Sequence, residues 1–84
     1  MNSEEFMKIV EELLTNEEVE FSYDNHFIVI QDSSEGGYEG SVYLSKEDYE
    51  QENDCADGGF CETIVAVAAV EFFIDISRGI NSCK

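Results

Sequence analysis

Clustered carboxylates are the most distinctive chemical feature of this sequence. Six acidic side chains lie within segment 47–57, and one tyrosine lies among them. They are Glu47, Asp48, Glu50, Glu52, Asp54 and Asp57, and the tyrosine is Tyr49. Like charges this close repel one another, so the cluster costs stability unless a cationic surface meets it. We interpret the segment as a contact surface for Lys and Arg side chains; the alternative is a solvated loop without a role.

A second acidic set belongs to a predicted strand. In segment 18–23 Glu18 and Glu20 alternate with apolar residues, which places both on the solvent-facing side of a sheet. Alternate residues of a strand lie ~6.6 Å apart, close to the spacing of neighbouring phosphates along one nucleic-acid strand. Glu39 and Tyr43 extend this set. The alternative is an ordinary polar sheet face.

Catalytic and metal-binding patterns are missing from the sequence. It has one histidine, His26, and no Gly-x-Ser-x-Gly motif, so no catalytic triad can be assembled. We therefore expect a protein that is not an enzyme and needs no cofactor, with His26 as a surface or turn residue. The alternating acids at 48, 50 and 52 resemble part of a calcium loop, but Gly59 stands where that loop needs a bidentate Glu.

The three cysteines, Cys55, Cys61 and Cys83, do not have the spacing of a structural zinc site. Their odd number argues against a disulfide scaffold, so we expect free thiols in a reducing interior. Under oxidising conditions Cys55 and Cys61 could close a small disulfide loop.

The acidic segments must be positioned by a few regular elements. Apolar residues at helical spacing predict a helix over 3–15, with Asn2 or Ser3 as its N-cap. The stripe is Phe6, Ile9, Val10, Leu13 and Leu14. Strands are predicted at 18–23, 26–31 and 38–45, with Asp24-Asn25 as a two-residue turn. The apolar run 27–30 places the second strand at the centre of the sheet.

The second half of the chain is predicted to hold a loop and a helix. Segment 46–59 lacks apolar periodicity and is interpreted as a loop with one helical turn near 46–51. A helix is predicted over 61–78, capped by Gly79, with Ile80 folding back on Ile74. Its buried stripe would be Ile64, Val65, Ala68, Phe72 and Ile76. Its unusual apolarity indicates burial on more than one side, against the sheet and against the first helix or a second subunit.

These elements predict a single α+β domain over residues 1–84. Three antiparallel strands would form the sheet, with the N- and C-terminal helices packed on one of its faces, in the order αβββα. The chain is long enough for only one modest core.

The net charge is the strongest indication of a partner. Twenty Asp and Glu against four Lys and Arg give −16, far more than solubility requires. Such a chain would be repelled by nucleic acid and by anionic membranes, so we expect neither as a direct partner. A basic nucleic-acid-binding protein is the expected partner; general acidity of a halophile is the alternative. The acidic N-terminus and the short apolar run 64–70 predict a cytoplasmic protein.

In size, charge and element order the chain resembles the small acidic phage proteins that inhibit host defence, the anti-CRISPR proteins among them. Several of these mimic DNA. The resemblance implies a CRISPR effector as target, whose positively charged channels and PAM-reading arginines suit acidic residues, and action in the host cytoplasm. Two alternatives remain open: an immunity protein or antitoxin that neutralises a nuclease toxin, and a non-catalytic adaptor that dimerises through its C-terminal helix.

Overall fold

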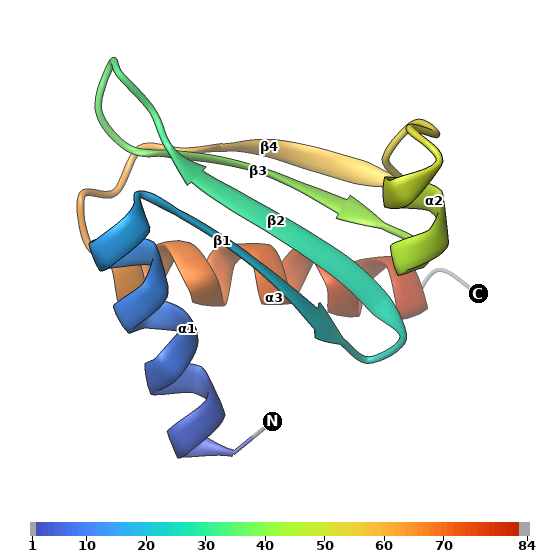
Figure 1. Cartoon of the computed structure of the whole chain (residues 1–84), viewed down its shortest axis with the longest axis horizontal. Helices are drawn as coiled ribbons and strands as arrows, with labels where there is room; N and C mark the ends of the chain where they lie inside the picture. The colour runs from blue at the N-terminus through green and yellow to red at the C-terminus, as the bar shows by residue number, and fades with distance from the viewer. Residues whose placement is uncertain (1, 83–84) are drawn as a thin grey trace.

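The computed structural model describes residues 2–82 as an α+β fold in which a four-stranded antiparallel sheet carries two long helices on one face (Figure 1). In chain order the elements are α1 (Ser3–Asn16), β1 (Glu18–Tyr23), β2 (His26–Asp32), β3 (Tyr38–Tyr43), α2 (Lys46–Glu50), β4 (Asp57–Cys61) and α3 (Ala66–Ser82). The predicted α+β class with helices near both ends is confirmed. The prediction of three strands is wrong, because β4 adds a fourth.

The sheet is a meander in which each strand pairs with its neighbour along the chain, in the order β1-β2-β3-β4. The predicted two-residue turn between β1 and β2 is confirmed. Asp24 and Asn25 both have positive φ, 49° and 69°, as a type I′ turn requires. Strand β2 lies between β1 and β3, as its apolar run 27–30 predicted.

The inner face of the sheet packs against α1 and α3 and forms the core. Alternation along the strands directs Val19, Ile30 and Val42 to this face, and each is at most 3% exposed. Helix α1 contributes Val10 and Leu13 to the same cluster. The opposite, outer face carries the alternating polar residues and is covered by neither long helix.

Helix α1 begins where the sequence predicted. The side chain of Asn2 accepts a hydrogen bond from the backbone N–H of Glu5 at 2.9 Å, so Asn2 is the N-cap. The first four members of the predicted stripe pack in or against the core. The fifth, Leu14, is 63% exposed.

Helix α3 buries a different face from the one predicted. The buried residues are Ala66, Ala69, Val70, Phe73, Ile74 and Ser77. Ile64 precedes the helix and is 84% exposed, and Val65 and Phe72 are 54% and 38% exposed. The predicted stripe is therefore wrong for Ile64, Val65 and Phe72, whereas Ile76 does pack against the core. Nearly every residue from 64 to 76 is apolar, so helical spacing alone does not fix which side of this helix faces the sheet.

The contact between Gly40 and Phe73 fixes the orientation of α3. A Cβ atom placed on Gly40 would lie 2.7 Å from two ring atoms of Phe73, closer than real side chains approach. Gly40 lies in β3 between Ile30 of β2 and Gly59 of β4. The missing side chain leaves the space that the fully buried Phe73 ring fills. Helix α3 also continues through Gly79, so the prediction that Gly79 caps it is wrong.

The segment predicted as a loop over 46–59 contains the expected helical turn, which is α2, but its last residues belong to β4. Strand β4 pairs with β3 over its whole length. Cys55 precedes this strand and Cys61 ends it, and both are free thiols. Cys83 lies outside the described residues.

His26 is a core residue rather than the predicted surface residue. It is 3% exposed at the start of β2, and Ser77 of α3 is fully buried beside it. The Nδ1 atom of His26 lies 2.6 Å from the hydroxyl oxygen of Ser77, a buried hydrogen bond. This pair joins the β1–β2 turn to α3.

Candidate partner-binding surface

The outer face of the sheet brings three of the predicted acidic residues together. Strand register aligns Glu18, Gln31 and Glu39 across β1, β2 and β3, and Glu20 follows two residues after Glu18. All four are exposed. Neighbouring strands lie ~4.8 Å apart, which puts the backbones of Glu18 and Glu39 ~9.6 Å apart. The face is open because the long helices cover the other side of the sheet (Figure 1).

The charges on this face repel one another in the free protein. Two unit charges ~6.6 Å apart, the strand spacing of Glu18 and Glu20, repel by about 0.6 kcal/mol even in water. This separation is within the Debye length of about 8 Å at physiological salt, so screening is incomplete. With four basic residues against 20 acids, the chain cannot neutralise them itself. A cationic surface placed here would relieve the repulsion.

Helix α2 joins the second predicted acidic segment to the same face. The Tyr49 hydroxyl donates a hydrogen bond to Oε2 of Glu20 at 2.6 Å. The Tyr49 ring packs against the rings of Phe27 and Tyr43, with centroids 5.0 and 5.2 Å away. Alternation along β2 and β3 directs Phe27 and Tyr43 to the outer face, and Phe27 is only 5% exposed because of this packing. Tyr49 therefore holds α2 over one end of the outer face.

The hydrogen bond to Glu20 changes the acidity of Tyr49. A carboxylate that accepts from the phenol stabilises its neutral form, and this raises the pKa of Tyr49 above its usual value of 10.0. Burial and the negative charge of Glu20 act in the same direction. Tyr49 was predicted as a partner-binding residue, but its hydroxyl and ring are both engaged within the protein.

Local capping explains why a helix forms in such an acidic segment. The Ser45 hydroxyl accepts a hydrogen bond from the backbone N–H of Asp48 at 3.2 Å. Glu47 and Asp48 lie in the first turn, where negative charge suits the positive end of the helix dipole. Lys46 and Glu50 form an exposed ion pair at 3.9 Å. Helix α2 thus holds several acids in a fixed arrangement beside the sheet.

We call this surface the acidic face. It comprises Glu18, Glu20, Glu39, Glu47, Asp48 and Glu50. Glu52 and Asp54 lie beyond α2, in the exposed connection to β4. Asp57 is paired with Val42, whose side chain points to the inner face. Asp57 therefore lies apart from the acids of the outer face.

Three residues of this surface were missed by sequence reasoning. Glu12 of α1 lines a shallow depression together with Glu18 and Glu20, at the β1 edge of the sheet. Gln31 lies directly between Glu18 and Glu39. Phe60 of β4 is aligned with Glu39 and is 45% exposed. The alternation of β2 could have identified Gln31. Glu12 could not be identified because its place depends on how α1 packs, and Phe60 could not because strand β4 has no recognisable sequence pattern.

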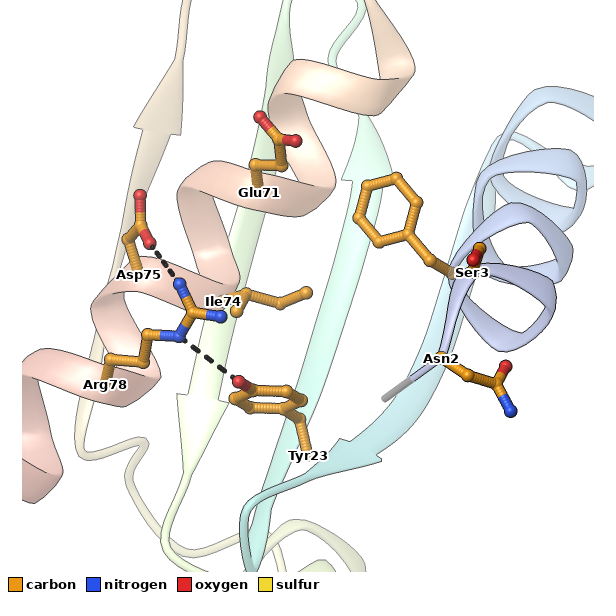
Figure 2. A pocket seen from close by; sticks show the side chains of 8 residues that line it. Asn2, Ser3, Tyr23, Glu71, Ile74, Asp75 and Arg78 are labelled. Carbon is orange, nitrogen blue, oxygen red and sulfur yellow. Dashed lines mark hydrogen bonds and ion pairs between the residues drawn. The ribbon is translucent and has the colours of Figure 1, made fainter.

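An open groove of about 630 Å³ lies on the other side of the sheet, between α1, β1 and α3 (Figure 2). Arg78 lies in it, and its guanidinium donates to the Tyr23 hydroxyl at 3.2 Å and to Asp75 at 3.3 Å. One of the four basic residues of the chain is therefore held in this groove by its own neighbours. We assign no ligand to it.

Residues 2–82 contain neither a metal-binding cluster nor a membrane-spanning helix. No three His, Cys, Asp or Glu side chains in this range lie close enough together to hold a metal ion. Within the same range, no helix has the length and apolarity needed to cross a membrane.

Comparison with known proteins gives no assignment. The chain matches no protein-family model, no curated protein and no solved structure.

Proposed function

We propose that this protein is an acidic inhibitor that binds the basic nucleic-acid-binding surface of another protein. The observation that carries the proposal is the hydrogen bond from Tyr49 to Glu20. It unites the acids of α2 with those of the sheet on one face. Carboxylates fixed on a folded scaffold meet Lys and Arg side chains without the entropy loss of ordering a loop.

The proposal extends to DNA mimicry. A DNA-binding protein uses Lys and Arg to neutralise phosphates. The acidic face offers carboxylates at strand spacing to the same side chains and would exclude nucleic acid from them. Given the resemblance in size and charge to anti-CRISPR proteins, we propose a CRISPR effector as the target. The same attraction between carboxylates and basic side chains would let the protein bind a nuclease toxin.

Direct competition tests the proposal. A Cas9-type effector loaded with guide RNA, and a nuclease toxin as a second target, would each be mixed with fluorescently labelled DNA and titrated with the protein. We expect a fall in DNA anisotropy for the true target. Higher salt should weaken the protein's binding, because the attraction is electrostatic. If the protein binds a target without displacing its DNA, mimicry is contradicted. If neither target binds at low salt, both named targets are wrong.

A further inference from the structure

We propose that the protein forms a symmetric homodimer through the free edge of β4 and the adjacent flank of α3, independently of the function proposed above. Strand β4 is paired with β3 on one side only. Exposed sheet edges are usually protected by Lys, Pro, a bulge or a covering helix. Strand β4, with the sequence Asp-Gly-Gly-Phe-Cys, has neither Lys nor Pro, and its one charged residue is Asp57 at its start.

The flank of α3 beside this edge is apolar and exposed. Helical spacing places Phe72 and the partly buried Ile76 on one flank of α3, opposite the side that faces α1 across the groove, and Val65 directly precedes the helix. Val65 is 54% exposed and Phe72 is 38% exposed. A stable dimer buries about 800 Å² on each partner. Two of the five β4 residues are glycines, so the strand needs this helical flank to reach such an area.

The distribution of charge favours a second copy of the chain as the partner at the β4 edge. Of the 20 acidic residues, 17 lie in residues 1–57, and segment 58–84 carries only Glu62, Glu71 and Asp75. Two of these three, Glu71 and Asp75, line the groove, where Arg78 donates to Asp75 (Figure 2). Strand β4 and the residue after it carry two acids, Asp57 and Glu62, fewer than the six of the acidic face. A second copy, itself strongly acidic, meets less repulsion there than on the acidic face, which a basic partner would favour.

The strand sequence also fits pairing with itself. An antiparallel pair centred on Gly59 places Asp57 opposite Cys61 of the second copy, and Gly58 opposite Phe60, so the two aspartates do not face each other. A Cβ atom on Gly59 would meet no atom within 4 Å of its own chain. The two-fold axis would stand perpendicular to the sheet. Both acidic faces would then lie on the same side of one continuous sheet.

Size-exclusion chromatography with light scattering tests the proposal on the full chain. We expect twice the mass of one chain at micromolar concentration and physiological salt, and a stronger dimer at higher salt, which screens the repulsion between two acidic chains. Phe72→Glu should give a monomer. Leu14→Glu, the same change at an exposed apolar residue of α1, should leave the dimer intact. A wild-type monomer, or equal effects of the two variants, would overturn the interface.

An engineered disulfide between the two copies tests the register of the β4–β4 pair. This test does not require the Phe72→Glu variant to fold. Residues directly opposite in an antiparallel pair have Cα atoms about 4.5–5.5 Å apart, within reach of a disulfide. With the native cysteines replaced by serine, Gly59→Cys should form a covalent dimer on mild oxidation. A variant that stays monomeric on a non-reducing gel would contradict pairing centred on Gly59.

Discussion

The Tyr49 hydroxyl lies 2.6 Å from a carboxylate oxygen of Glu20, and this contact links two segments 29 residues apart in the chain. Together with the packing of the Tyr49 ring, it brings the acids of α2 and those of β1 onto one surface. Without it, α2 would be held mainly by the packing of the Tyr49 ring on Phe27 and Tyr43. The first prediction concerns this link.

Tyr49→Phe removes the donor and keeps the ring. We expect a loss of unfolding free energy of about 0.5–1 kcal/mol at neutral pH, since the bond is solvent-exposed. The pKa of Tyr49 is raised in the folded state, so the contribution of the bond is fully present below about pH 10, the usual tyrosine pKa. It is lost as the pH rises through the higher folded value.

Urea unfolding at several pH values, with tyrosinate absorbance recorded alongside, measures both effects. The variant should lack the tyrosine that ionises at elevated pH. If the difference in stability between the two proteins does not shrink above about pH 10, the hydrogen bond is not its source.

The buried pair of His26 and Ser77 gives the second prediction. Ser77→Ala leaves the His26 ring nitrogen buried without its partner, which costs about 1–3 kcal/mol. The better helix propensity of alanine offsets about 0.5 kcal/mol of this. Denaturant unfolding should therefore show a clear net loss. Ser22→Ala, at an exposed position on β1, is the control and should change stability little.

Two glycine-to-alanine substitutions should have opposite effects. Gly40→Ala drives a methyl group against the Phe73 ring and should destabilise the protein by about 1–3 kcal/mol. Phe73→Leu in the same chain should recover part of that loss. Gly79→Ala, within α3 and with open space around it, should stabilise the protein by up to about 1 kcal/mol. If Gly79→Ala destabilises the protein instead, Gly79 has the left-handed conformation of a helix cap and α3 ends at this residue.

The sequence predicts the first half of the fold well because each element there has one unambiguous pattern. Val19 and Phe21 alternate with glutamates, and Asp24-Asn25 suits only a tight turn. The second half does not have such patterns. Strand β4 contains Gly58-Gly59 and forms only because β3 is available to pair with it. The space at Gly40 determines which side of α3 faces the sheet. The spacing of apolar residues along the sequence cannot reveal this space.

The candidate surface was partly predictable for the same reason. Strand alternation identified Glu18, Glu20 and Glu39, and the charge cluster identified α2. The sequence could not indicate that the two sets meet, because this depends on a contact between residues far apart in the chain. Nor could it indicate that Asp57 points to the other side of the sheet.

The affinity of two triple variants for the target protein tests the central claim most directly. One variant combines Glu18→Gln, Glu39→Gln and Glu47→Gln on the acidic face, leaving the Tyr49–Glu20 bond intact. The other combines Glu4→Gln, Glu11→Gln and Glu71→Gln on α1 and α3, with the same net charge. Exposed ion pairs contribute about 0.2–1 kcal/mol each, and about 1.4 kcal/mol is tenfold in Kd, so we predict that the loss of three pairs weakens binding about tenfold for the first variant only. Equal losses for both variants would mean that net charge alone, rather than a surface built by β1, β3 and α2, attracts the partner.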